Sequence, residues 1–181
     1  MKIAGFGKKT TGFIDEAQTT FVKFTDSKSG QSFRIEYKDK KEFYIKPGPF
    51  TGFSIVDKHQ LLDQHEHTYT ILYISTASKE HEVVDYKISE ALYEHYQGWR
   101  GIKNYCNIGY GVEKILKQGS GLLYEGPPSG ADVVKNVLTE YGISYSTPLE
   151  GKANRKKYKV LFLGSNYIVA HDFEFKTISM N

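Results

Sequence analysis

The sequence predicts an α+β fold with a mostly antiparallel sheet and two to three helices packed on it. Three observations lead to this fold class. Strand-type alternation fills the first third of the chain and its last part, helical spacing is concentrated between them, and the two kinds of segment do not alternate regularly. At 181 residues the chain has the length of one ordinary domain, so we predict a single globular domain over residues 1–181.

The strands are predicted from alternating apolar and polar residues. In SFRIEYK, Phe33, Ile35 and Tyr37 share one face, and charged residues occupy the other. This pattern is typical of a half-buried antiparallel strand. Further strands are expected at residues 19–26, 42–46, 67–75 (HTYTILYIS) and 82–87 (EVVDYK), and as a hairpin over 157–176 that turns at 164–166.

The helices are predicted from apolar residues three and four positions apart. The best signal is GPPSGADVVKNVLTEYG (126–142), in which Ser129 is a candidate N-cap and Gly142 a stop. Ile88, Leu92 and Tyr96 have helical spacing in the segment 87–99. A third stripe consists of Ile108, Val112, Ile115 and Leu116, and Gly119 follows it.

Composition and charge narrow the function classes. The net charge is only +3 and basic residues are interleaved with acids, so no nucleic-acid partner is expected. One cysteine excludes an internal disulfide or a multi-cysteine metal site, and no cofactor is expected. No signal-peptide run and no apolar stretch of membrane-spanning length is visible. We therefore expect a soluble protein, cytoplasmic or delivered by a non-classical route.

The single cysteine is the first candidate for chemistry. Cys106 precedes the third helical stripe and lies well over 90° from it on a helical projection, using about 100° per residue. A cysteine that only fills the core would be expected on the stripe. The start of a helix also favours the thiolate, which is the reactive form of a cysteine nucleophile.

A nucleophilic thiol needs a base, and several histidines qualify. His65 and His67 are predicted to open a strand, on the face that also carries tyrosines. His81 or Asp85, on the expected neighbouring strand, is a candidate to orient an imidazole on His67. His171 is an alternative base. No third metal ligand follows the His65–His67 pair at a known spacing, so no metal site is predicted there.

The order of these segments resembles that of a known enzyme family. A histidine-bearing strand and a second strand precede a helix and then N-x-C-x-x-x-x-G-V-x-x-I-L-K, from Asn104 to Lys117. This layout is similar to the permuted branch of the NlpC/P60-like, papain-fold hydrolases, which includes lecithin:retinol acyltransferase-like proteins and several bacterial toxin domains. The resemblance covers about residues 64–118.

The resemblance implies roles for three residues. Cys106 would be the nucleophile and His67 the base, with His65 as the second choice. The reaction would be attack on an amide, ester or thioester carbonyl, and the substrate a protein, peptide or lipid amide. The chain would then be a hydrolase or acyltransferase, in keeping with a bacterial effector or toxin domain.

The composition also suggests a function without catalysis. The chain contains 14 tyrosines and 11 phenylalanines, which supply interface area at modest entropic cost. The alternative is therefore a protein-binding or assembly module, such as an immunity, adaptor or phage-type component with a partner protein. An ADP-ribosyl-transfer domain, suggested by Arg34 and by Ser75-Thr76, lacks a place for the Glu-x-Glu loop.

Overall fold

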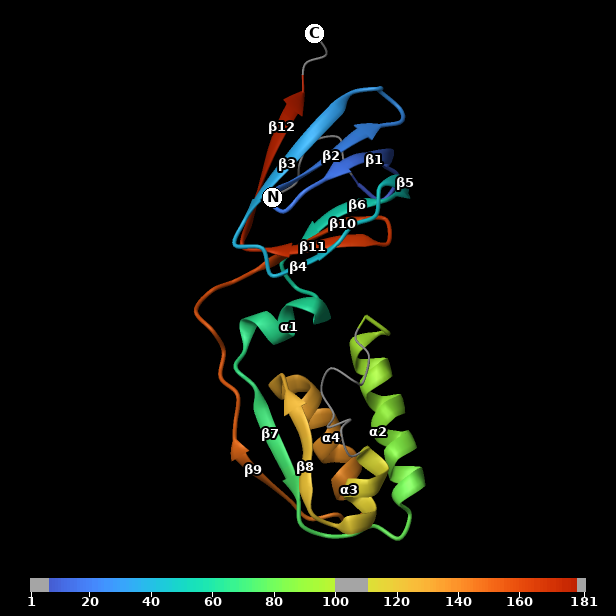
Figure 1. Cartoon of the computed structure of the whole chain (residues 1–181), viewed down its shortest axis with the longest axis vertical. Coiled ribbons are helices and arrows are strands. Elements are labelled where there is room, and N and C mark those ends of the chain that lie inside the picture. The colour runs from blue at the N-terminus through green and yellow to red at the C-terminus, as the bar shows by residue number, and fades with distance from the viewer. Residues whose placement is uncertain (1–6, 100–110, 179–181) are drawn as a thin grey trace. The chain divides into compact units, whose positions relative to one another are not determined.

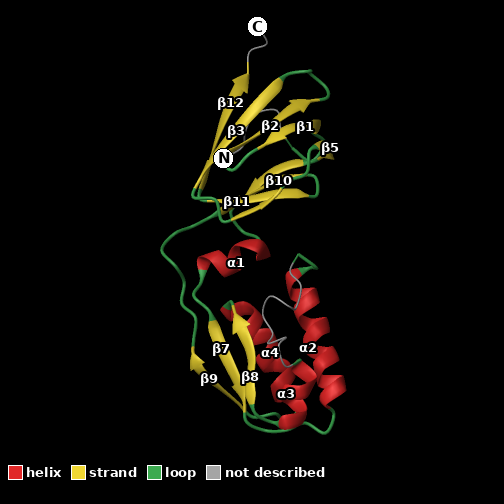
Figure 2. Cartoon of the chain, in the orientation of Figure 1, coloured by secondary structure: helices red, strands yellow, loops and turns green. Residues whose placement is uncertain are grey.

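The structure is a computed structural model that describes residues 7–99 and 111–178. These residues form four helices and twelve strands, and every strand pair is antiparallel, so the predicted α+β class is confirmed (Figures 1 and 2). In chain order the elements are β1 (Thr11–Ala17), β2 (Phe21–Asp26), β3 (Ser32–Lys38), β4 (Glu42–Tyr44), β5 (Gly48–Thr51), β6 (Phe53–Val56), α1 (Gln60–Glu66), β7 (Thr70–Ile74), α2 (His81–Tyr96), α3 (Val112–Gln118), β8 (Gly121–Gly126), α4 (Pro128–Glu140), β9 (Tyr145–Leu149), β10 (Lys159–Leu163), β11 (Asn166–Ala170) and β12 (Asp172–Ile178).

The contacts of the chain divide it into two compact units. Unit 1 comprises Met1–Leu62 and Lys156–Asn181, and unit 2 comprises Asp63–Arg155. Unit 2 is therefore an insertion between the two segments that build unit 1. The expectation of a single globular domain over residues 1–181 stays a prediction. No described helix is long and apolar enough to cross a membrane.

Unit 1 consists of two antiparallel sheets, with the strand orders β12-β3-β2-β1-β5 and β4-β11-β10-β6. Its core confirms the predicted alternation in β3, because Ile35 and Tyr37 are buried. The closing hairpin is also confirmed, since Leu163 of β10 pairs with Asn166 of β11 across the turn. Gly164 has a φ of 62° in this turn, a backbone conformation that residues with a side chain rarely adopt.

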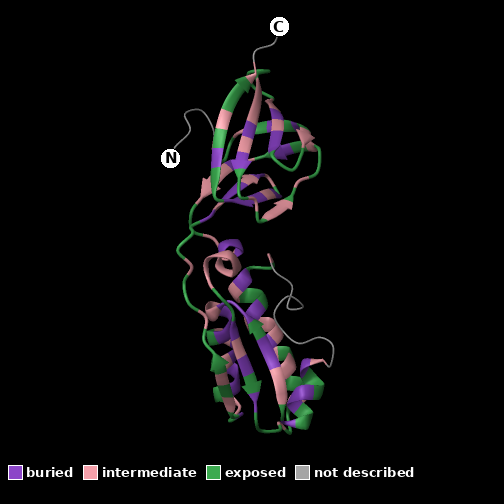
Figure 3. Ribbon diagram, turned by 60° about the vertical axis from the view of Figure 1, so that its left-hand side comes forward, coloured by how far each residue is buried: buried purple, intermediate pink, exposed green. Residues whose placement is uncertain are grey.

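Unit 2 is a three-stranded sheet of order β8-β7-β9 with α2, α3 and α4 packed on one face (Figures 1 and 2). Burial alternates along β7 (Figure 3). Leu72 and Ile74 face the helices, and Tyr73 between them is 43% exposed. The helices contribute apolar stripes to the same core, which includes Ile88 and Leu92 of α2. The predicted helix at 126–142 is confirmed as α4.

Two strand predictions in unit 2 are wrong. The segment EVVDYK, expected as a returning strand, is the beginning of α2. The reason is its spacing: Val84 lies four residues before Ile88 and is fully buried, so it extends the helical stripe by one turn. The strand expected from His67 begins only at Thr70, and the short helix α1 occupies residues 60–66 before it.

Candidate functional site

Four polar side chains of unit 2 form what we call the Asp63 cluster: Asp63, His67, His95 and Ser129. They come from α1, the residue after it, the last turn of α2 and the first turn of α4. His67 Nδ1 lies 2.9 Å from Asp63 Oδ1, and Ser129 Oγ donates a hydrogen bond to Asp63 Oδ2. His95 Nε2 lies 2.9 Å from Ser129 Oγ. One carboxylate, with its side chain only 16% exposed, thus contacts His67 and Ser129 directly and is linked to His95 of α2 through Ser129.

The hydrogen bonds define where the protons of the cluster lie. His67 Nδ1 faces two acceptors, Asp63 Oδ1 and the Asp63 carbonyl oxygen at 3.1 Å, so this nitrogen carries the proton. His67 Nε2 is then the nitrogen that can accept a proton in the neutral ring. Because the Ser129 hydroxyl donates its proton to Asp63, His95 Nε2 is the donor in its contact with Ser129.

The start of α4 places Ser129 in the cluster. Ser129 was expected to cap this helix, but the N-cap is Pro127, and Ser129 follows inside the first turn with its hydroxyl directed to Asp63. Gly130 allows two buried hydroxyls to approach the helix, because an added Cβ would lie 2.5 Å from Tyr96 Oη and even closer to Tyr124 Oη. Tyr124 Oη donates to the Pro127 carbonyl at 2.8 Å.

The predicted site residues have different outcomes. His67 lies in the Asp63 cluster, although at the end of a helix and not on a strand. His65 lies on α1, where its Nε2 is 3.1 Å from Gln64 Nε2. Cys106 lies outside the described residues. His171, the alternative base, is an exposed residue between β11 and β12 of unit 1.

The carboxylate that contacts His67 is Asp63, four residues earlier, and not one of the residues proposed from the sequence. His81 and Asp85 lie on α2, so the expectation that they occupy a neighbouring strand is wrong. Burial raises the pKa of the Asp85 carboxyl, and the nearby charge of Glu113 raises it further.

Three members of the cluster were missed from the sequence. Asp63 could have been found, because Asp63 and His67 are four residues apart and a helix brings such residues to one face. His95 and Ser129 are 34 residues apart in sequence, and Ser129 and Asp63 are 66 apart. No local pattern links residues at these separations, so only the packing of the helices brings them together.

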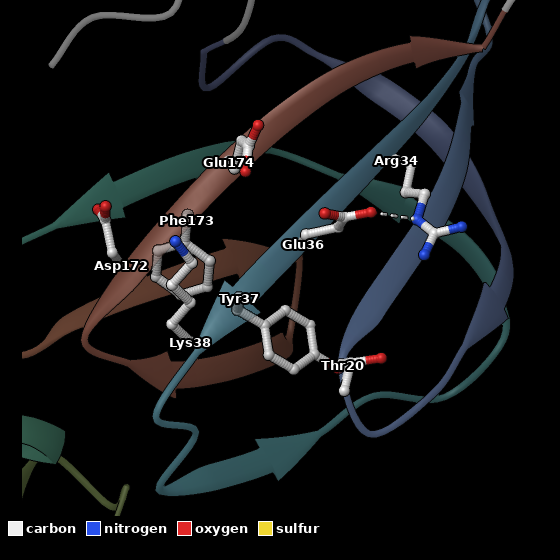
Figure 4. A pocket seen from close by; sticks show the side chains of 8 residues that line it. All are labelled: Thr20, Arg34, Glu36, Tyr37, Lys38, Asp172, Phe173 and Glu174. Atoms are coloured by element: carbon white, nitrogen blue, oxygen red, sulfur yellow. Dashed lines mark ion pairs between the residues drawn. The ribbon is translucent and has the colours of Figure 1, made fainter.

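A separate concavity of about 450 Å³ lies on unit 1. Eight side chains line it, from β3, from β12 and from Thr20 (Figure 4). Its charges are largely paired within the protein: Arg34 Nε is 3.0 Å from Glu36 Oε1, and the guanidinium of Arg34 stacks 3.9 Å from the Phe21 ring. The lining contains no imidazole and no thiol, so it lacks the base and nucleophile of an acyl-transfer site.

Comparison with protein-family models, with curated proteins and with solved structures gives no match to this chain. The resemblance to papain-fold hydrolases therefore stays a prediction. The Asp63 cluster combines an imidazole, whose Nδ1–H bonds a mostly buried carboxylate, with a hydroxyl that the same carboxylate holds.

Proposed function

We propose that the chain is a cysteine-dependent hydrolase or acyltransferase that acts on an amide, ester or thioester. Cys106 is the nucleophile, His67 the base and Asp63 the carboxylate that orients the base. The observation that supports this proposal is the pair of His67 Nδ1 and Asp63 Oδ1 at 2.9 Å. In cysteine and serine hydrolases a carboxylate or amide in this position fixes the ring and leaves Nε2 to take the proton of the nucleophile.

The proposed reaction has two steps. In the first, His67 Nε2 removes the proton of the Cys106 thiol, the sulfur attacks the substrate carbonyl, and the imidazolium returns the proton to the leaving group. In the second, water or another acceptor loses a proton to His67 Nε2 and attacks the thioester, which regenerates the thiol. Asp63 stabilises the imidazolium through Nδ1 without taking its proton.

Ser129 is a second hydroxyl nucleophile to consider in the same cluster. Its proton is directed to the Asp63 carboxylate, since Oγ donates to Oδ2 and accepts from His95 Nε2. A carboxylate is a weaker base than an imidazole, and a hydroxyl gives up its proton less readily than a thiol. These differences favour the Cys106–His67 pair as the reacting groups and Ser129 as a group that holds Asp63.

The test measures nucleophile reactivity in the full chain. We expect iodoacetamide to label native Cys106 rapidly at pH 7, and labelling to slow at least tenfold in His67→Asn and below about pH 6. The matched control is His171→Asn, an exposed histidine of unit 1, which should leave the rate unchanged.

Two results would contradict the proposal. Labelling of Cys106 only in the unfolded protein would exclude it as the nucleophile. Labelling of wild-type protein by a fluorophosphonate, lost in Ser129→Ala but kept in Cys106→Ser, would transfer the role to Ser129. Ser120→Ala, an exposed serine of the same unit, is the control for the second experiment.

A second candidate function is that of a protein-binding module, favoured by the outer face of α2. Tyr86 and Tyr93 are 62% and 67% exposed, and a seven-residue spacing places them on one side of the helix. Val83, 46% exposed, lies three residues before Tyr86. Under this function a stable partner should bind wild-type protein and be lost in the double variant Tyr86→Ser, Tyr93→Ser, while iodoacetamide labelling stays slow.

A further inference from the structure

We propose that unit 2 contains a zinc site formed by His81, Glu82 and Glu113, which we call the His81 site. His81 and Glu82 are the first two residues of α2, and Glu113 lies on α3, which packs against α2. One nitrogen and two carboxylate oxygens from these residues all lie within 4.8 Å of one another. The site shares no residue with the Asp63 cluster, so it does not depend on the proposed function.

The ring nitrogen Nδ1 of His81 is buried and lacks a hydrogen bond within the described part of the chain. Its side chain is 19% exposed, yet Nδ1 itself is inaccessible to water and makes no hydrogen bond with any described residue. Its charged neighbour is Glu113 Oε1, whose side chain is 48% exposed. A buried polar atom without a hydrogen bond costs about 1–3 kcal/mol, and such atoms in native proteins call for an explanation, of which a bound ion is one. A metal ion supplies the missing partner for a neutral imidazole nitrogen.

Two of the ligand atoms lie at a distance that suits a shared ion. His81 Nδ1 lies 3.4 Å from Glu113 Oε1, which is longer than the usual 2.9–3.0 Å of an N–H···O hydrogen bond. Two ligand atoms bound to one tetrahedral zinc ion, with bonds of about 2.1 Å, are separated by about 3.4 Å. The observed separation therefore fits two atoms that share an ion better than two atoms that share a proton.

Helix electrostatics explain only part of this arrangement. Glu82 and Glu113 lie in the first turns of their helices, where the macrodipole favours acidic side chains in the absence of any ligand. The same macrodipole disfavours a protonated histidine there, because cations are stabilised at the other end of a helix. One ligand atom of His81 nevertheless lies within 4.8 Å of both carboxylates at this end of the helix, and a cation bound by all three groups accounts for that arrangement.

The donor set favours zinc over the harder cations. Imidazole nitrogen is a common zinc ligand, whereas magnesium and calcium take oxygen ligands almost exclusively. Two carboxylates and a neutral imidazole neutralise a dication. Three protein ligands leave the fourth tetrahedral position for water, which is the composition of catalytic zinc sites.

The test titrates metal-free, full-length protein with zinc chloride by isothermal calorimetry, with magnesium chloride in parallel. We expect one zinc ion per chain, no magnesium binding at the same concentrations, and at least tenfold weaker zinc binding in both His81→Ala and Glu113→Gln. Glu90→Gln on α2 removes an acid that pairs with Lys87 and is the matched control, with unchanged affinity expected. Circular dichroism verifies that each variant is folded.

Further readouts separate this site from other ligands on the chain. Cobalt(II) should give the intense visible absorption of tetrahedral coordination, and His81→Ala should abolish it. His67→Asn should leave zinc affinity unchanged, because His67 belongs to the other cluster. The proposal is overturned if no zinc binds, if binding survives in Glu113→Gln, or if it is lost in His67→Asn and kept in His81→Ala.

Discussion

Replacing Asp63 with asparagine tests whether its carboxylate holds the cluster together. The substitution keeps the size of the side chain and removes its charge, so the contacts with His67 Nδ1 and Ser129 Oγ would lose their charge-assisted character. Hydrogen bonds to charged groups contribute about 1.5–3 kcal/mol and those between neutral groups about 0.5–1.5 kcal/mol. The difference is about 1 kcal/mol for each of the two bonds.

Exposure reduces this figure. The side chain of Asp63 is 16% exposed and that of His67 is 30% exposed, so water partly compensates the loss of the contact between these two residues. We therefore expect Asp63→Asn to lower the free energy of unfolding by about 1–2 kcal/mol. With a urea m-value of about 1.5 kcal/mol per molar, the midpoint falls by roughly 1 M.

The only tryptophan of the chain, Trp99, lies in unit 2 and makes its fluorescence a reporter for that unit. Urea denaturation of the full chain, followed at this residue, gives the midpoint. Asp132→Asn is the matched control, since Asp132 is 69% exposed and pairs only with Lys135 among the described residues, so it should change stability by less than about 0.5 kcal/mol. If the two variants have midpoints within experimental error of each other, Asp63 does not hold the cluster.

Three further predictions test the packing of unit 2 and the electrostatics of unit 1. Thr70 is fully buried and its Oγ1 accepts a backbone N–H at 2.9 Å, so Thr70→Val should cost about 1–3 kcal/mol in a urea melt and Thr70→Ser much less. Gly119 has a φ of 77° and an added Cβ would lie 2.7 Å from Ala77 Cα, so Gly119→Ala should cost at least about 2 kcal/mol. Gly142, with a φ of 65° and open space around it, should cost only about 1 kcal/mol when changed to alanine, and equal melting temperatures for the two variants would contradict this difference. Burial raises the pKa of Tyr37 to about 12, so the folded chain keeps a proton that the unfolded chain loses near pH 10, and stability should fall between about pH 10 and 12, a loss that Tyr37→Phe should remove in melts across this range.

The sequence predicts the parts of the fold that depend on local patterns. The alternation in β3 and the turn of the closing hairpin were visible because a two-residue period and a Gly-Ser pair need no knowledge of distant segments. The helix α4 was equally visible, since its valines and leucine repeat at helical spacing and a glycine follows them.

The errors arise where two local signals compete. Valine and tyrosine in EVVDYK favour a strand, but Val84 continues the series of Ile88 and Leu92 at intervals of four, and burial of that stripe outweighs a β-propensity of at most about 1 kcal/mol. Around His67 the β-rich composition predicted a strand that begins at His67, but the strand begins at Thr70. The residues just before His67 form a short helix that buries Leu61 and Leu62, and the strand pattern gave no sign of it. The Asp63 cluster and the His81 site both depend on the packing of helices, which the sequence does not show.

The two oxygens of Asp63 separate a structural role from a catalytic one. Oδ2 accepts from Ser129 and so connects α4 to the cluster, whereas Oδ1 pairs with His67 and so sets the orientation of the ring. Ser129→Ala removes the first contact and keeps the second. If the cluster serves only stability, this variant and Asp63→Asn should reduce Cys106 labelling in proportion to their loss of stability. If Asp63 orients the base, Asp63→Asn should slow labelling by more than its loss of stability accounts for, whereas Ser129→Ala should not. The reason is that only Asp63→Asn weakens the bond that holds His67.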